Sequence, residues 1–313
     1  MPALVRLRRN HVAIMCGFLF VLVVLLCLSA PLVAQYIAHS GPNDNHITDT
    51  ITVGGETENV VSLSGVPIGP TWHGQFFLGA DTNGRDVFVR VLYGGRTSLE
   101  IGFLAATLTM TVATCVGLLA GYYRGWFDGI VSRVLDFMWA YPVILLAISL
   151  GTILAVSGIE IGPLHLKAGS LAVPVTIIGV VHIPYVARPI RGQVLSIRER
   201  EFIDASRMLG MSSVRIMVTD VLPNLIPTIV VFAPLMVATS ILLEAGLSFL
   251  GVGVQLPSPS WGNMIGAGVG QISSAPHGVL VPGLFLVTAV LGINGFADGL
   301  REAVDPRSRM YFR

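Results

Sequence analysis

Long apolar blocks alternate with shorter polar segments along this chain, and this pattern predicts membrane-spanning helices. A helix needs about 20 apolar residues to cross the hydrocarbon core of a bilayer. Six blocks of roughly this length are present, at residues 12–37, 101–123, 137–159, 168–187, 221–243 and 279–297. The pattern therefore predicts an all-α polytopic membrane protein with six transmembrane helices.

The first apolar block, at residues 12–37, follows a short basic stretch and has the general layout of a cleaved signal peptide. The apolar region of such a peptide is about 7–15 residues long. This block is much longer, so we expect a first helix that is retained.

Composition agrees with the membrane class. Hydrophobic residues make up 53% of the 313 residues and charged residues 12%, whereas soluble domains carry about 25% charged residues. The formal net charge is +1, and a chain so close to neutral argues against a nucleic-acid partner.

The basic residues predict the direction of the helices, because positive side chains are retained on the cytoplasmic face. With the N-terminus inside, Arg85, Arg90, Arg96 and Lys167 lie outside. The rest of the 19 lysines and arginines then lie inside: Arg6, Arg8, Arg9, Arg124, Arg133, Arg188, Arg191, Arg198, Arg200, Arg207, Arg215, Arg301, Arg307, Arg309 and Arg313. We therefore expect both termini, and the loop at residues 188–220, in the cytoplasm.

This orientation divides the chain into four parts. They are residues 1–37 (cytoplasmic N-terminus and first helix), 38–97 (outer loop), 98–301 (core with five helices) and 302–313 (cytoplasmic tail). The early half of the outer loop is polar and strand-like, with turn residues interspersed. A second outer segment, residues 246–278, has no charged residue and contains Pro257 and Pro259. A re-entrant hairpin there would need burial in protein or contact with water.

The charged segment at residues 198–223 is the most informative part of the chain, because it lies between two apolar blocks. Residues 199–209 predict a short helix with one face marked by three- and four-residue spacing. That face consists of Phe202, Ala205, Ser206 and Leu209. Gly210 suits the left-handed position that follows a helix, and Ser212 or Ser213 could cap the next helix. An ordered segment of this kind indicates a surface presented to a cytoplasmic partner.

The sequence contains no recognisable catalytic or nucleotide-binding motif. The GxxxxGK[ST] loop that cradles nucleotide phosphates is absent, and so are HExxH, GxSxG and CxxC. Cys16, Cys27 and Cys115 lie within apolar blocks and match neither a metal-ligand spacing nor a disulfide framework. We expect this chain to be non-catalytic and to bind no metal or cofactor.

A spaced pattern runs through the charged segment: Asp204-Ala205-Ser206, then Gly210, then Asp220-Val221-Leu222-Pro223. It resembles the EAA loop in permease subunits of binding-protein-dependent ABC importers, which reads E-A-A, three residues, G, nine residues, I-x-L-P. Asp204, Ser206 and Asp220 depart from that pattern. Asp220 replaces an isoleucine, and this leaves the packing role of the position open.

Further blocks follow one another in order: LGADTNGRD at 78–86, GGRTSL at 94–99, EAGLSFLG at 244–251 and DGLREAVDPR at 298–307. They resemble blocks of dipeptide and oligopeptide permeases, so the chain resembles the C-type permease subunit of such an importer. Ala80 stands where the family usually has threonine, and the insert at about residues 40–75 is not covered by the resemblance.

The resemblance implies a type I ABC importer permease fold, in which the EAA segment forms a coupling helix that docks in a groove of a cytoplasmic ATPase. Phe202 and Leu209 would anchor this helix, and Asp204 and Arg207 would set its register. The coupling residues would be Glu201, Phe202, Asp204, Ala205, Ser206, Arg207, Leu209 and Gly210.

The resemblance also implies the partners of the chain. They would be a homologous second permease, two ATPase subunits that use ATP and magnesium, and an extracytoplasmic substrate-binding protein. The complex would lie in the bacterial cytoplasmic membrane and carry dipeptides or oligopeptides by alternating access. Nickel chelates and glutathione are alternative cargoes within the same family.

Glu244 lies near the outer end of the fifth apolar block, where a carboxylate is costly to expose to lipid. We expect an ion pair with Arg85, Arg90 or Arg96. The alternative is that Glu244 lines the translocation path and meets the ammonium group of a peptide. Separately, Asp81, Arg85 and Asp86 are expected to form a local network that orders the preceding loop.

Two other classes of membrane protein fit less well. An ion-coupled secondary transporter needs ionisable groups at mid-membrane, and the six blocks contain only His182. A membrane-embedded hydrolase or transferase needs a nucleophile with a base, and no such arrangement is evident.

Overall fold

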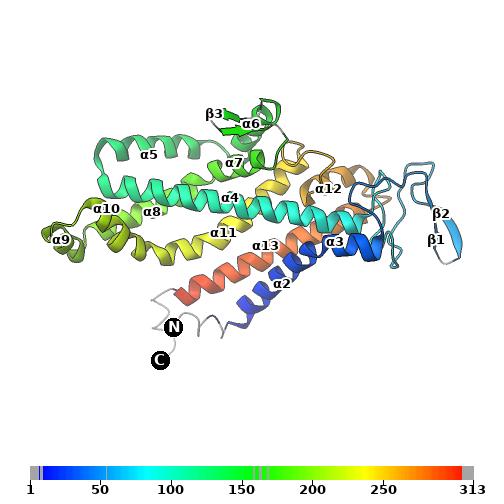
Figure 1. Cartoon of the computed structure of the whole chain (residues 1–313), viewed down its shortest axis with the longest axis horizontal. Helices are drawn as coiled ribbons and strands as arrows, with labels where there is room; N and C mark the ends of the chain where they lie inside the picture. Colours follow the sequence, from blue (N-terminus) through cyan, green and yellow to red (C-terminus); the bar gives the residue numbers. More distant parts are fainter. Residues whose placement is uncertain are drawn as a thin grey trace.

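The computed structural model describes residues 7, 10–53, 55–157, 159–161, 164–167 and 169–304. The molecule is an elongated bundle whose helices run mainly along the long axis (Figure 1). Strands β1 (Thr50–Val53) and β2 (Glu56–Asn59) lie at one end, called here the outer end; helix α9 (Glu201–Met208) lies at the other, the inner end. Most of the expected cytoplasmic tail falls outside the described residues. So do six of the arginines expected inside: Arg6, Arg8, Arg9, Arg307, Arg309 and Arg313.

In the described part of the chain, four helices are long and apolar enough to cross a membrane: α2 (His11–Leu28), α4 (Val87–Tyr123), α11 (Leu222–Phe249) and α13 (His277–Val304). Helix α4 begins well before the expected residue 101, because Asp86 caps it. The Asp86 Oδ1 atom accepts the N–H groups of Phe88 and Val89 at 2.8 and 3.1 Å. The outer loop expected at residues 38–97 therefore ends at Asp86, and Arg90 and Arg96 belong to the helix.

Two further helix pairs reach the length of a span only when each pair is counted together. They are α5 (Gly125–Ala140) with α6 (Val143–Ser157), bent by 93°, and α7 (Ala172–Val181) with α8 (Ile183–Arg198), bent by 41°. With both pairs, the described residues contain up to six candidate spans, and the expected all-α polytopic class is confirmed.

The sharper bend corrects the straight span expected at residues 137–159. Tyr141 has extended backbone angles (φ −93°, ψ 140°), since the residue before a proline is disfavoured in a helix, and Pro142 follows it. Helix α5 therefore ends before the break, and it covers residues that were expected to form a loop. It runs beside α4, while α6 turns away (Figure 1).

Short elements connect the spans. After α2 come α3 (Ala30–Val33) and the π-helical turn η1 (Ala34–Ala38), and β3 (Ile159–Ile161) pairs antiparallel with β4 (Leu164–Leu166). At the inner end, α10 (Ser213–Ile216) and η2 (Met217–Val221) join α9 to α11, and at the outer end α12 (Trp261–Gly268) and η3 (Val269–Gln271) precede α13. The antiparallel β1–β2 hairpin agrees with the strand-like pattern of the outer loop.

Helix α12 is buried on one side, where Trp261, Gly262 and Met264 pack against the protein. Ser260 and Asn263 form a capping box at its start. Trp261 is fully buried, and its indole N–H donates to the carbonyl of Val91 in α4 at 3.0 Å. These contacts fix α12 against the outer part of α4.

Helix α4 lies at the centre of the bundle and packs closely against α8. A Cβ atom added at Gly117 would lie 2.8 Å from the Ala187 carbonyl oxygen, and one added at Gly121 would lie 2.8 Å from Val194 Cβ. Only glycine permits this approach of the two backbones.

Candidate functional site

Helix α9 protrudes at the inner end of the molecule (Figure 1). On its inward side, Ile203 is fully buried and packs into the main hydrophobic core. Gly210 follows the helix with φ +74°, the left-handed conformation that glycine adopts without strain. Ser212 Oγ accepts the N–H of Arg215 and so caps α10. The structure thus contains the short helix, the glycine stop and the following cap that the sequence predicts.

The outward side of α9 exposes large apolar side chains to solvent. Phe202 is 45% exposed, Met208 88% and Leu209 81%. Exposed apolar side chains that lie close together are typical of interaction surfaces, so these residues are candidates for one. Met208 was not among the predicted coupling residues, because it lies off the face that the three- and four-residue spacing defines. Its position next to Leu209 at the end of the helix could have indicated its exposure.

The polar residues of α9 have two different roles. Arg207 Nη1 donates to Asp204 Oδ1 at 2.9 Å in an exposed ion pair, so both remain at the rim of the apolar cluster. Ser206 Oγ instead donates to Asp220 Oδ2 at 2.8 Å. Asp220 belongs to η2, so this bond joins the helix to the start of α11. Among the other predicted coupling residues, Glu201 and Ala205 are exposed.

The Ser206–Asp220 bond explains both unusual residues of the motif. Serine replaces the second alanine of the family pattern, and aspartate replaces the isoleucine. In the structure these two departures are each other's partners. The role of position 220, left open by the sequence, is therefore to accept a hydrogen bond from α9.

Arginine side chains fasten the α9 region to the inner end of α4. Arg198, just before α9, donates through Nη1 to the backbone carbonyl of Tyr122 and lies 5.7 Å from the centre of its ring. Arg207 lies 6.0 Å from the same ring. Arg124 Nη2 contacts Glu199 Oε1 at 2.5 Å. These contacts connect the α9 region to the inner end of α4.

A cluster of charged residues is buried at the outer end, before and within the first turn of α4. Arg85 Nε donates to Asp81 Oδ2 at 2.8 Å, and Arg90 Nε lies 3.3 Å from the same oxygen. Asp81 Oδ1 also accepts the backbone N–H groups of Asn83 and Arg85. Of the expected network of Asp81, Arg85 and Asp86, the contact between Asp81 and Arg85 is present; Arg90 joins it, and Asp86 does not.

Asp86 is fully buried and belongs to the helix cap rather than to the arginine cluster. Its Oδ2 accepts the N–H of Phe76 at 2.7 Å, and its Oδ1 accepts those of Phe88 and Val89. Burial raises the pKa of this carboxyl group above its ordinary value, and the three N–H groups oppose that rise.

The expected ion pair of Glu244 is not formed. Glu244 is fully buried in α11, and its Oε1 accepts a hydrogen bond from Ser248 Oγ at 2.6 Å. Arg85 and Arg90 are engaged by Asp81, and Arg96 is exposed and lies over the ring of Tyr93. The prediction failed because spacing along the chain does not reveal that Asp81 lies closer to both arginines.

Serine hydroxyls surround Glu244 instead of cations. The buried side chains of Ser98 and Ser260 also lie near its carboxyl group, although Glu244 Oε2 has no hydrogen-bond partner among the described residues. Each of the three hydroxyl oxygens also accepts a backbone N–H: that of Val254 for Ser248, of Trp261 for Ser98 and of Asn263 for Ser260. Glu244 therefore organises the corner where α4, α11 and α12 meet, and with its side chain fully buried it faces no open passage in this structure.

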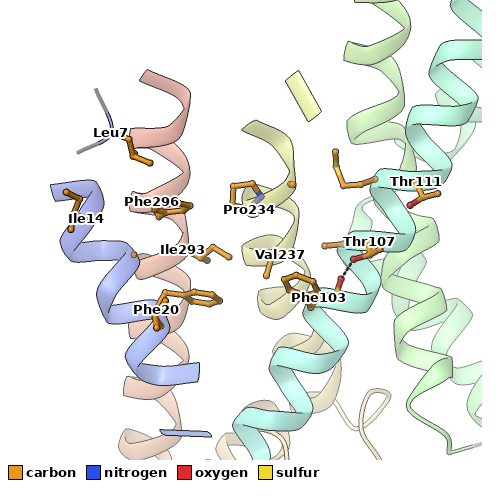
Figure 2. Close-up of a pocket in the computed structure, with 15 residues that line it drawn as sticks. Leu7, Ile14, Phe20, Phe103, Thr107, Thr111, Pro234, Val237, Ile293 and Phe296 are labelled. Atoms are coloured by element: carbon orange, nitrogen blue, oxygen red, sulfur yellow. Dashed lines mark hydrogen bonds between the residues drawn. The ribbon is translucent and has the colours of Figure 1, made fainter. Parts of the chain in front are cut away.

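A large apolar cavity of about 590 Å³ lies between two helix pairs, α2 with α13 and α4 with α11. Figure 2 shows Phe20, Ile293 and Phe296 on one side of it and Phe103 and Val237 on the other. Its lining contains no charged residue. A zwitterionic peptide would leave both of its charges unpaired against this lining.

Comparison with known proteins agrees with these features. A family model described as "Binding-protein-dependent transport system inner membrane component" matches residues 113–310, a stretch that includes α9, Gly210 and Asp220. The chain belongs to this family. A second model, the N-terminal transmembrane domain of oligopeptide transport permease C, matches residues 3–47. Members of the family are membrane-embedded permeases, so the chain is a multi-pass membrane subunit.

Two relatives and one solved structure are similar to this permease. The dipeptide transport system permease protein DppC of Alkalihalophilus pseudofirmus is 43% identical over 75% of this chain and 73% of its own length. The glutathione transport system permease protein GsiD of Pectobacterium atrosepticum is 35% identical over 96% and 89%. The inward-facing MetNI methionine ABC transporter is 22% identical, with a TM-score of 0.55 over 69% of this chain and 96% of that chain. That likeness supports the type I importer permease fold.

The matched stretches also divide the sites of this permease. The α9 region and Glu244 lie within the family model, whereas Asp81, Arg85 and Arg90 lie between the two matched stretches. The outer arginine cluster is thus described by neither model.

Proposed function

We propose that this permease carries dipeptides or oligopeptides inward across the bacterial cytoplasmic membrane, driven by ATP that partner subunits hydrolyse. The exposed apolar side of α9 carries the proposal, because it is a docking surface joined by specific contacts to the spans. The relative named as a dipeptide permease supports the peptide cargo. Glutathione is the second candidate, supported by the relatives with that name.

The proposed docking follows from the geometry of α9. Phe202, Met208 and Leu209 enter an apolar groove of the ATPase, where burial of such anchors supplies most of the binding energy. Asp204 and Arg207 stay at the polar rim and fix the register. Glu201 and Ala205 complete the outward surface, and Gly210 lets the chain turn back toward the membrane.

The proposed transport step moves α9 with the ATPase. Ile203, Arg198 and the Ser206–Asp220 bond connect α9 to the core, to α4 and to α11. Closure of an ATPase pair on ATP would therefore shift these spans as rigid bodies and give alternating access. ATP and magnesium belong to the ATPase subunits in this proposal, and this chain binds neither.

The proposed assembly contains a homologous second permease, two ATPase subunits and an extracytoplasmic binding protein. In this assembly the inner end and both termini face the cytoplasm, and the outer end receives the binding protein. Within the described residues, Asn10 Nδ2 donates to Glu302 Oε2 at 3.0 Å. This places the start of α2 beside the end of α13, in agreement with termini on one side.

Uptake by the reconstituted importer tests the proposal. Proteoliposomes with this chain, a second permease, the ATPases and the binding protein should take up labelled dipeptide only when ATP is inside. Phe202→Asp should abolish that uptake without loss of inserted protein, since Phe202 is exposed. Competition with glutathione separates the two cargoes. Uptake by this chain alone on a proton gradient would contradict the importer mechanism.

A further inference from the structure

A small cavity lies at the outer end, between the first turn of α4 and the α12–η3 segment. Its walls include Asp81, Arg85 and Arg90 on one side and Asn263 and Gln271 on the other. Its volume is about 30 Å³. One water molecule needs about 10–15 Å³ on this measure. The cavity therefore has room for one small ion or two waters, and a whole peptide does not fit.

The wall of this cavity carries more positive than negative charge. Arg85 is 7% exposed and Arg90 2%, and both rely on the single carboxylate of Asp81. Asp86 makes no ion pair with either arginine, because its oxygens are taken by three backbone N–H groups. A buried charge is strongly unfavourable unless an opposite charge compensates it. The pair of arginines therefore lacks one counter-charge.

Several hydrogen-bond donors in the wall have no partner among the described residues. Arg85 donates to Asp81 through Nε and its backbone N–H, which leaves Nη1 and Nη2 unused. Arg90 Nη1 donates to Pro42 and Asn43, which leaves Nη2. Gln271 accepts from Ser274 through Oε1 and leaves its Nε2 group unused. Guanidinium and amide N–H groups of this kind are the donors that bind anions.

We propose that this cavity binds one small monovalent anion, either a halide such as chloride or the carboxylate group of a larger molecule. The anion accepts hydrogen bonds from Arg85 and Arg90 on the α4 side and from Gln271 on the η3 side. It supplies the missing counter-charge. Because the donors come from two separate segments, the bound anion holds the α12–η3 segment against the first turn of α4.

Anion-dependent thermal stability tests the site. The full-length permease in lipid nanodiscs is unfolded in chloride, bromide, acetate or isethionate at equal ionic strength; isethionate is too large for the cavity. Chloride and bromide should raise Tm above the isethionate value and saturate with concentration, as binding to the folded state requires. An equal response to acetate would show that a carboxylate is also accepted, and a response to halides alone would identify the free ion as the occupant.

Matched arginine variants locate the response. Arg85→Gln should raise the halide concentration at half-effect by about tenfold or more, since bonds between charged groups are lost. Arg96→Gln should leave it unchanged, because Arg96 lies on the same helix but is exposed. Gln271→Leu leaves the ion pairs intact and should weaken anion binding less than Arg85→Gln does. It still tests the site if Arg85→Gln fails to fold. Equal Tm in chloride and isethionate, or an unchanged response in both Arg85→Gln and Gln271→Leu, would overturn the proposal.

Discussion

The α9 region exposes the Asp204–Arg207 ion pair beside large apolar side chains, whereas the cluster at the start of α4 buries two arginines. The side chains of Asp204 and Arg207 are 56% and 39% exposed; those of Arg85 and Arg90 are 9% and 2% exposed. An exposed pair adds little to the stability of the chain that contains it. A buried pair is costly to break. The exposed charges of α9 are therefore available for the recognition proposed above, whereas Arg85, Arg90 and Asp81 contribute to the fold.

Matched Asp→Asn substitutions at the two ion pairs should give the largest difference in the free energy of unfolding. Asp81→Asn removes the only counter-charge of two buried arginines, and we expect a loss of about 3–5 kcal/mol in the free energy of unfolding. The loss is measured in chloride-free buffer by denaturant titration in mixed micelles. Asp204→Asn, the control at the exposed pair, should have little effect. Similar results for the two variants would mean that burial does not separate the two ends.

An apolar-to-charged substitution on α9 should have the next largest effect, on binding rather than on stability. Leu209→Asp places a charge in the docking surface, and we expect at least about 2 kcal/mol of lost affinity for the ATPase, or roughly 30-fold. The affinity is measured with the purified ATPase and the permease in nanodiscs. Leu63→Asp, at a fully exposed residue of the outer loop, should leave it unchanged. Equal losses in both variants would remove α9 as the docking site.

The hydrogen bond between Ser206 and Asp220 should have the smallest effect, and a double-mutant cycle sharpens its meaning. Ser206→Ala and Asp220→Ile each restore the family pattern at one position and remove the bond between the two side chains; Ser206 Oγ can still donate to the Phe202 carbonyl, and Asp220 Oδ1 still accepts from Thr219 Oγ1. We expect the two singles together to cost about 1 kcal/mol more in unfolding free energy than the double variant. Strictly additive effects would show that the two departures are independent.

The sequence predicted those features that depend on periodicity and local chemistry. Apolar blocks located the spans, and the spacing around Gly210 located α9, its left-handed stop and its cap. The start of α4 could have been found as well, because Asp86 directly precedes an apolar run and aspartate is a favoured N-cap residue. The bend at Tyr141 was available from the proline that follows it.

Other features depended on contacts between distant segments, which no local pattern encodes. Glu244 was expected beside an arginine, but in the folded chain Asp81 is closer to Arg85 and Arg90, and Ser248 is closer to Glu244. The bond between Ser206 and Asp220 depends on the way α9 folds back on η2. Both corrections concern which partner a polar group finds, rather than whether it needs one.

Helix α4 connects the α9 region to the buried arginine cluster at the outer end. It runs for 37 residues, from the cap at Asp86 to Tyr122 beside the α9 region, a length of about 55 Å at 1.5 Å per residue. At Gly117 and Gly121 the backbone of α4 is in close contact with α8. A stiff lever of this length, tilted by about 10° around its middle, moves each tip by about 5 Å in opposite directions. A push delivered at the tip beside α9 would therefore arrive at the outer tip as a displacement of several ångströms.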